Sequence, residues 1–264
     1  MPHPDEKVHP AATGLAKDTV DKHQDDADLV FWSGWFCPFN QRIWMALEER
    51  KISYKYQEVN PYKKEKHFLD LNPLGLVPTL EIKSEGDSQN KALYESDVLV
   101  EFLEDLYPAS EEHPSIFPQD TYEKSWARLN VQHITKKIIP AYFKLQQFQD
   151  SSDQEKAREE LYSGLRTLAE RVKRPYFAGE QFTAVDMSIA PFVRRFYNLV
   201  EYRDLDESKV GNGWLEYREK LLDRESLKDT SSEDKYYAEL LSRYLKNEAQ
   251  SEVAKSTRGG QSLP

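Results

Sequence analysis

One stretch near the N-terminus constrains the fold of this chain most strongly. The apolar run Phe31-Trp32-Ser33 ends at Gly34, and the single cysteine of the chain, Cys37, stands directly before Pro38. Residues 41–50 then space their apolar side chains as on one face of a helix. Because proline is favoured in the first turn of a helix, Cys37 is predicted to lie at or just before a helix N-terminus. The N–H groups and the macrodipole there favour an anion, so we expect a reactive thiolate rather than an inert buried thiol.

Length and charge limit what else the chain can be. Its 264 residues allow one large domain or two modest ones. A formal net charge of -10 argues against a nucleic-acid partner and against a nonspecific anionic membrane surface. No apolar run approaches the roughly 20 residues of a membrane-spanning helix, and the N-terminus has no apolar signal core. With its single cysteine, the chain fits a reducing compartment, so we expect a cytoplasmic protein with no metal site and no membrane contact.

The order of sequence patterns predicts an α/β domain followed by an all-α domain. Residues 1–27 are polar and aperiodic and are expected to form a flexible arm. Residues 28–108 read as strand, helix and strand, then two more strands and a helix, and a proline-rich linker over 109–119 follows. Residues 120–249 are helical in pattern, and 250–264 are expected to be a disordered tail.

Local signals sharpen parts of this prediction. The helical pattern that begins at residue 120 should kink or break near Pro140, since proline removes a helical hydrogen bond. Thr183 and Asp186 are spaced as a capping box at the start of a helix that is apolar nearly all round. Ser96 is a plausible N-cap of another helix. Pro78 opens a strand, and a cis Val77–Pro78 bond would turn the Val77 backbone outward toward a ligand.

Motifs in the first half of the chain resemble those of a known family. They are Cys37-Pro38-Phe39-x-Gln41-Arg42, Asn72-Pro73-x-Gly75-x-Val77-Pro78 and Tyr94-Glu95-Ser96. Their order and spacing resemble the cytosolic glutathione transferases, and the Cys-Pro-Phe segment resembles the omega class, in particular its fungal omega-like members. The resemblance implies a thioredoxin-like N-terminal domain, an all-helical C-terminal domain and a homodimer.

The resemblance also implies which residues hold glutathione. Ser96 at a helix start would bind the γ-glutamyl carboxylate, and Glu95 would bind the ammonium group of the same residue. The backbone of Val77, before Pro78, would pair with the tripeptide like an added strand. Lys64 matches the position that holds the glycyl carboxylate, and Phe39 one whose backbone contacts glutathione. The alternatives are that Ser96 is only a cap and Lys64 only a solvated charge.

Cys37 distinguishes this chain from transferases that carry tyrosine or serine in the same role. A cysteine can itself accept the glutathionyl group from a substrate. A dithiol enzyme would carry its resolving cysteine where this chain has Asn40, so a second glutathione must release the first. The sequence therefore predicts a glutathione-dependent thiol transferase or reductase that acts on small substrates, with glutathione as co-substrate.

The acceptor side is less defined. By the resemblance it should lie between the domains, near Trp35 and Phe36, with Arg195, Tyr237 and Tyr244 from the helical domain, and it should take hydrophobic or aromatic small molecules. The aromatic residues around Cys37 can equally be core. Two alternative functions stay open: a ligand-binding protein for planar aromatic compounds, and a reductase of glutathionyl-hydroquinones or phenacyl-glutathiones. The charged residues of the helix after Cys37 argue against a related class, the intracellular chloride channels.

Overall fold

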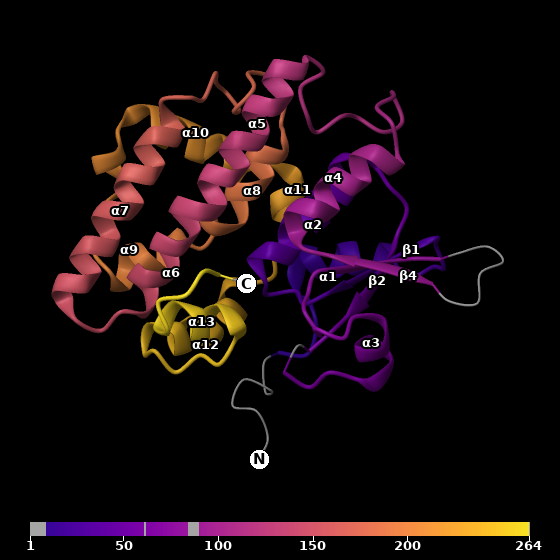
Figure 1. Ribbon diagram of the computed structural model, residues 1–264, viewed down its shortest axis with the longest axis horizontal. Helices are drawn as coiled ribbons and strands as arrows, with labels where there is room; N and C mark the ends of the chain where they lie inside the picture. The colour runs from indigo at the N-terminus through magenta and orange to yellow at the C-terminus, as the bar shows by residue number, and fades with distance from the viewer. Residues whose placement is uncertain (1–8, 61, 84–89, 264) are drawn as a thin grey trace. The chain divides into compact units, whose positions relative to one another are not determined.

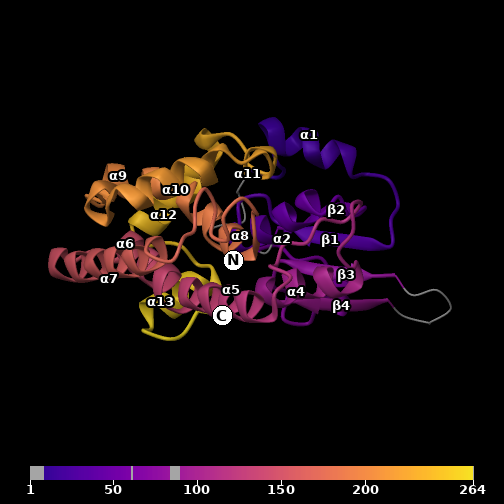
Figure 2. The same cartoon turned by 90° about the horizontal axis from the view of Figure 1, so that it is seen from above.

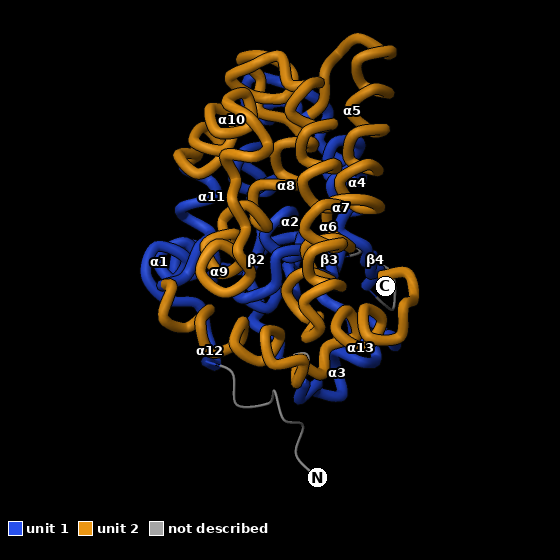
Figure 3. The backbone as a smooth tube through the Cα atoms, turned by 90° about the vertical axis from the view of Figure 1, so that its left-hand side faces the viewer, with its two compact units in different colours: residues 1–116, 225–233 blue, residues 117–224, 234–264 orange. Residues whose placement is uncertain are grey.

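The computed structural model describes residues 9–60, 62–83 and 90–263 (Figure 1). It divides into two compact units, which Figure 3 shows in different colours. Unit 1 comprises residues 1–116 and 225–233, and unit 2 comprises residues 117–224 and 234–264. The boundary at 116/117 falls inside the stretch 109–119 that the sequence marks as a linker. The return of 225–233 to unit 1 has no counterpart in the sequence prediction.

Unit 1 is built on a four-stranded sheet in the order β2-β1-β3-β4, in which β1 pairs parallel with β2 and antiparallel with β3. Its elements are α1 (Gly14–Lys22), β1 (Leu29–Ser33), α2 (Pro38–Glu49), β2 (Lys55–Glu58), α3 (Lys66–Leu71), β3 (Thr79–Ile82), β4 (Lys91–Tyr94), α4 (Ser96–Leu106) and α11 (Glu225–Asp229).

Helices cover both faces of this sheet (Figure 1). All residues of β1 are buried, as expected for a strand between two layers. Phe31 faces α2, where its ring lies 6.5 Å from that of Trp44. Trp32 points to the other face, where its ring lies 5.6 Å from that of Phe68 on α3. The alternation of the strand therefore directs neighbouring aromatic residues into two separate layers.

Unit 2 is helical. Its elements are α5 (Thr121–His133), the π-helical turn η1 (Ile134–Ile138), α6 (Ile139–Gln147), α7 (Ser151–Ala169), α8 (Ala184–Val193), α9 (Phe196–Tyr202), the 3-10 turn η2 (Glu207–Val210), α10 (Asn212–Asp223), α12 (Asp234–Leu245) and α13 (Glu252–Arg258). The break predicted near Pro140 is confirmed and takes the form of the π-helical turn just before it. All residues of α8 are buried, and its capping box between Thr183 and Asp186 is confirmed. The fold class predicted from the sequence is thus confirmed.

The expectation of an arm without structure is wrong for residues 14–22, which form α1. Figure 2 shows this helix beside α11, and the Thr19 hydroxyl donates to the Asp229 carbonyl at 2.8 Å. Its buried side is made of small residues, Ala16 and Thr19, which do not give a strong apolar pattern. Residues 1–8 of the predicted arm lie outside the described residues.

The expectation of a disordered tail is likewise wrong for residues 252–258, which form α13. The Ser251 hydroxyl caps this helix by accepting from the Ala254 N–H at 3.1 Å. Ala254 and Thr257 are buried, and α13 packs against α6. The small and polar residues near both ends of the chain therefore led to a wrong prediction of disorder for α1 and α13.

Candidate functional site

The residues predicted to bind glutathione lie at one end of the sheet of unit 1. Strand β3 begins at Thr79, which is the register partner of both Trp32 near the end of β1 and Tyr94 at the end of β4. The loop that carries Cys37 follows β1, Pro78 immediately precedes β3, and Glu95 immediately follows β4. Segments far apart in sequence therefore meet at this end of the sheet.

Cys37 is the N-cap residue of α2 and is partly exposed. Its backbone is extended, with φ -80° and ψ 123°, and Pro38 occupies the first helical turn, as the sequence predicts. The Gly34 carbonyl accepts from the Cys37 N–H at 3.0 Å and from the Asn40 side-chain amide at 3.1 Å, which closes the turn before the helix. The thiol therefore stands where the dipole of a 12-residue helix favours a thiolate.

The start of α4 differs in detail from the prediction. Ser96 is the first residue of the helix, and Glu95, an exposed residue, occupies the N-cap position. The prediction of Ser96 as N-cap is therefore wrong by one residue, because the extended strand continues to Tyr94 and Glu95 makes the turn. The Ser96 hydroxyl accepts a hydrogen bond from Arg42 Nη1 at 3.2 Å.

The turn before Pro78 brings Lys64 close to the same end of the sheet. Gly75 has φ +61°, and a Cβ atom there would lie 2.6 Å from Cδ of Lys64. The lysine side chain therefore lies directly over this glycine, and only glycine fits both the backbone conformation and the space. The Val77–Pro78 peptide bond is cis, and the Val77 side chain packs against the cluster that holds Phe68.

The two aromatic residues just before Cys37, Trp35 and Phe36, differ in their exposure to solvent. Trp35 is buried, and its indole N–H donates to the His9 carbonyl at 2.8 Å. Phe36 is partly exposed, and its ring stacks on that of Tyr62 with centroids 6.2 Å apart. Trp35 is therefore part of the core of unit 1, whereas part of Phe36 remains exposed.

Glu58, at the end of β2, is a residue of this region that the sequence analysis missed. Its carboxylate accepts from the Trp35 N–H at 3.0 Å and from the Tyr56 hydroxyl at 3.1 Å. Burial raises the pKa of Glu58 to about 7, although the hydrogen bonds from Trp35, Tyr56 and the Ala12 backbone act in the opposite direction. A single, partly buried carboxylate thus joins the loop before Cys37 to the segment before α1.

Arg42 is the second residue that was missed, although it stands in the Cys-Pro-Phe motif. Its side chain is 1% exposed, and Nη1 lies 3.0 Å from the Asp97 carboxylate. Burial lowers the pKa of the guanidinium, while attraction to Asp97 and to Cys37 raises it. The signal that could have found it is the position of a charged residue five places after Cys37, in the helix that the cysteine precedes.

Arg195, Tyr237 and Tyr244, the predicted acceptor residues of the helical domain, belong to unit 2. The Arg195 guanidinium lies over the Tyr237 ring, 4.7 Å from its centroid, and both residues are buried. Tyr244 instead lies beside Phe143, with ring centroids 6.0 Å apart, and its hydroxyl is 2.7 Å from that of Ser251. Two of the three residues are therefore brought together within this unit.

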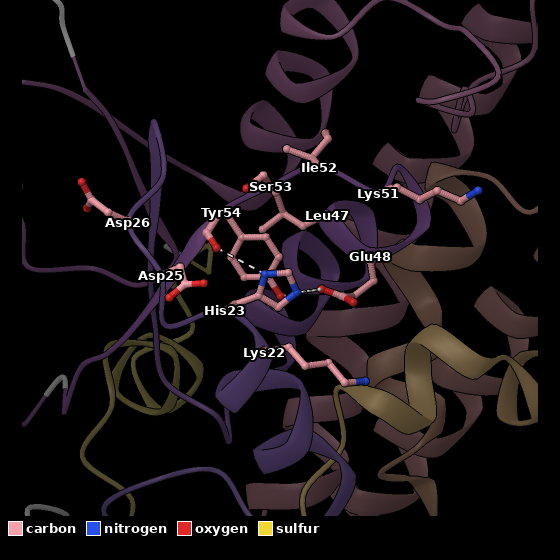
Figure 4. Close-up of a pocket in the computed structure, with 10 residues that line it drawn as sticks. All are labelled: Lys22, His23, Asp25, Asp26, Leu47, Glu48, Lys51, Ile52, Ser53 and Tyr54. Carbon is pink, nitrogen blue, oxygen red and sulfur yellow. Dashed lines mark hydrogen bonds and ion pairs between the residues drawn. The ribbon is translucent and has the colours of Figure 1, made fainter.

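Unit 1 also carries a cavity of about 440 Å³, shown in Figure 4. His23 lies at its centre, stacked on the Tyr54 ring at 3.8 Å, with Nε2 at 3.1 Å from the Glu48 carboxylate. None of the predicted site residues lines it, and its lining mixes Lys22 and Lys51 with acidic groups. The charged side chains around the cavity are thus of both signs, so they do not favour a ligand of one charge.

Comparison with known proteins agrees with this geometry. Residues 36–106 match the family model described as the glutathione S-transferase N-terminal domain, and residues 135–220 match the C-terminal domain. The glutathione S-transferase DHAR2 of Arabidopsis thaliana is 31% identical, over 74% of this chain and 84% of the relative. The chain belongs to the glutathione transferase family. Glutathione S-transferase omega-1 of Sus scrofa is 29% identical, over 68% of this transferase and 72% of the relative.

A solved structure supports the same assignment. Glutathione transferase Omega 3C from Trametes versicolor superposes with a TM-score of 0.80 at 46% identity, over 84% of this transferase and 97% of that chain. The sequence-based prediction of an omega-type transferase is confirmed. Glutathione is the co-substrate of this family. Over residues 9–60, 62–83 and 90–263, no helix has the length and apolar character to cross a membrane.

Proposed function

We propose that this transferase moves glutathionyl groups through a covalent intermediate on Cys37. The observation that carries the proposal is the position of Cys37 at the N-terminus of α2, at the end of the sheet where Val77, Glu95, Ser96 and Lys64 also lie. This end of the sheet suits a tripeptide with two carboxylates. It offers a thiolate, a turn whose backbone can pair with a peptide, the N-terminus of a helix and a lysine.

The reaction follows from the chemistry of a single thiol. The Cys37 thiolate attacks the glutathionyl sulfur of a mixed disulfide, so that a bond from Cys37 to glutathione forms, the substrate disulfide breaks, and the substrate leaves as its thiolate. A second glutathione, as thiolate, then attacks the same glutathionyl sulfur. It releases glutathione disulfide and restores the Cys37 thiolate. No second cysteine in the chain can take this part.

The remaining residues would hold glutathione in place. We assign the γ-glutamyl carboxylate to the Ser96 hydroxyl and the first N–H groups of α4, and the ammonium group to Glu95, which is exposed to receive it. The Val77 backbone would pair with the cysteinyl residue, and Lys64 would hold the glycyl carboxylate. Phe39, which follows Pro38 in the first turn of α2, would contribute its backbone.

Cys37→Ser tests the mechanism. We expect the variant to lose mixed-disulfide reduction, because a hydroxyl cannot form the disulfide intermediate. Treatment of the wild type with glutathione disulfide should add one glutathionyl group per chain, seen by mass spectrometry, and excess glutathione should remove it. The rate of alkylation of Cys37 against pH should give a midpoint in the range of roughly 3.5–7.5 that is typical of activated thiols.

A wild-type thiol with a midpoint near that of free cysteine, roughly 8.5, that also resists glutathionylation would exclude the mechanism. The alternative of a protein that holds planar aromatic compounds would then take its place, with the stacked rings of Phe36 and Tyr62 as the candidate surface. The reductase of glutathionyl-hydroquinones or phenacyl-glutathiones uses the same thiol chemistry, so assays with those substrates distinguish it. Detoxification, a homodimer and a cytoplasmic location remain predictions.

A further inference from the structure

Arg42 lies at the centre of the region assigned to glutathione, and no step of the proposed reaction uses it. It is the fifth residue after Cys37, on the face of α2 that turns toward α4. One nitrogen, Nη1, donates to the Ser96 hydroxyl at 3.2 Å and to the Asp97 carboxylate at 3.0 Å. The guanidinium also lies over the Phe39 ring, 5.3 Å from its centroid. One buried cation therefore touches three residues of the motif-bearing segments.

The Arg42 guanidinium lies close to Cys37 in the fold, because it covers the ring of Phe39, two residues after Cys37, in the first turns of the helix that Cys37 caps. A Coulomb interaction is mutual, so the attraction to Cys37 that favours the charged form of Arg42 also favours the thiolate. Since Arg42 is 1% exposed, water screens this attraction less than it would at the surface. Asp97, whose carboxylate lies beside the same nitrogen, partly offsets the positive charge that Cys37 experiences.

The guanidinium also sets the direction of the Ser96 hydroxyl. The Ser96 oxygen accepts from Nη1, so the hydroxyl proton must point away from the guanidinium. In that orientation the hydroxyl can donate to a carboxylate placed at the start of α4. The hydrogen bond from Arg42 therefore prepares Ser96 as a donor before glutathione arrives.

We propose that Arg42 is a positioning residue that serves both halves of the glutathione site: it stabilises the Cys37 thiolate and it orients Ser96 toward the γ-glutamyl carboxylate. Only the effect on Ser96 rests on the proposed function, because it assumes that Ser96 binds the γ-glutamyl carboxylate. Arg42 acts through Cys37 and through Ser96, which the two halves of the test separate.

Other charged groups on the neighbouring elements must be considered in a pH experiment. On α4, Glu104 lies beside Arg50 near the other end of α2, and on β2, Glu58 faces the loop before Cys37 through the Trp35 N–H. Helix α11 packs against α2, and its charged residues are Glu225, Lys228 and Asp229. The further acidic residues of α4 are Glu101 and Asp105. Asp97 is the group whose removal bears directly on Arg42.

The first half of the test measures the pH midpoint of Cys37 alkylation by iodoacetamide, without glutathione. Arg42→Met removes the charge, and we expect its midpoint to rise by roughly one pH unit. Asp97→Asn keeps the acceptor oxygen but removes the opposing charge, so its midpoint should fall. Arg50→Met is the matched control, because it removes another buried arginine, the C-cap residue of α2, which is paired with Glu104. That control should leave the midpoint unchanged.

The second half measures the Michaelis constant for glutathione. Arg42→Lys keeps the positive charge, so we expect an alkylation midpoint near that of the wild type. It loses the planar guanidinium that orients the Ser96 hydroxyl, so we expect the Michaelis constant for glutathione to rise several-fold. Equal midpoint shifts in Arg42→Met and Arg50→Met, or a midpoint that does not fall in Asp97→Asn, would overturn the inference. If Arg42→Met does not fold, Asp97→Asn still decides it. Midpoints that move as expected in a protein that reduces no mixed disulfide would remove the proposed function and leave the effect of Arg42 on the thiolate established.

Discussion

Glu95 has a backbone conformation that few residues other than glycine adopt. Its φ is 73° and its ψ is 110°, and it stands immediately before Ser96 at the start of α4. A non-glycine residue in this region carries a cost of about 1–3 kcal/mol, and such strain is concentrated at functional sites. The strained turn leaves the Glu95 side chain exposed beside the helix N-terminus. This geometry supports the role of Glu95 as the partner of the glutathione ammonium group.

The role of Ser96 leads to a prediction at this scale. Ser96→Ala removes one hydroxyl that would bind a carboxylate, a hydrogen bond worth about 1.5–3 kcal/mol because one partner is charged. We therefore expect the Michaelis constant for glutathione to rise by roughly 10- to 100-fold, as steady-state kinetics would measure, with an unchanged alkylation midpoint for Cys37. Ser110→Ala, in the stretch that links the units, is a suitable control. Unaltered glutathione affinity in a folded Ser96→Ala protein would show that the carboxylate binds elsewhere.

At the scale of elements, the sequence predicts what is determined locally. The Cys-Pro helix start, the break before Pro140 and the Thr183 capping box all depend on residues within a few positions of each other. Helix α1 could not be predicted in this way, because its hydrogen-bond partners lie far along the chain. The Thr13 N–H, for example, donates to the Ser232 hydroxyl at 3.1 Å. For the same reason the contacts of Arg42 and Glu58, which join segments far apart in the sequence, could not be predicted from it.

The capping box of α8 gives the second prediction. Asp186 is fully buried and accepts from the Phe177 N–H at 2.8 Å, from the Thr183 N–H at 2.7 Å and from the Tyr217 hydroxyl at 2.7 Å. Asp186→Ala leaves these donors without acceptors, each at a cost of about 1–3 kcal/mol. Thr183→Ala removes only the hydroxyl, which caps the helix and donates to the Asp186 carboxylate at 2.8 Å, at a cost of about 1–2 kcal/mol. Thermal unfolding should therefore show a much larger loss for Asp186→Ala, and similar losses for both variants would contradict this account.

At the scale of the whole molecule, the two units carry different parts of the predicted chemistry. Cys37 and every residue assigned to glutathione belong to unit 1, whereas Arg195, Tyr237 and Tyr244 belong to unit 2. Unit 1 is completed by residues 225–233, which the chain supplies after most of unit 2. Gln41 of α2 donates to the Leu227 carbonyl at 3.3 Å and to the Ser231 hydroxyl at 2.9 Å. The helix that carries Cys37 is thus held partly by a segment from the far end of the chain.

The partly buried carboxylate of Glu58 predicts how the stability of the molecule depends on pH. Burial raises its folded-state pKa from 4.5 to about 7, so the folded protein binds this proton more tightly than the unfolded chain does. The resulting stabilisation is fully present below the unfolded value and is lost as the pH rises through about 7, which amounts to about 3 kcal/mol in the free energy of unfolding.

Glu58→Gln should remove this dependence, since glutamine has nearly the same shape and does not titrate. Urea unfolding at about pH 5 and about pH 8 would measure it, with the free energy of unfolding of the wild type falling more between the two than that of the variant. The exposed Glu112→Gln serves as control and should follow the wild type. Because the Glu58 carboxylate also accepts from the Trp35 N–H, the same variant reports whether this loop depends on the charge. Identical pH dependence in wild type and Glu58→Gln would mean that Glu58 is ionised in the folded protein and that its desolvation is offset by its hydrogen bonds.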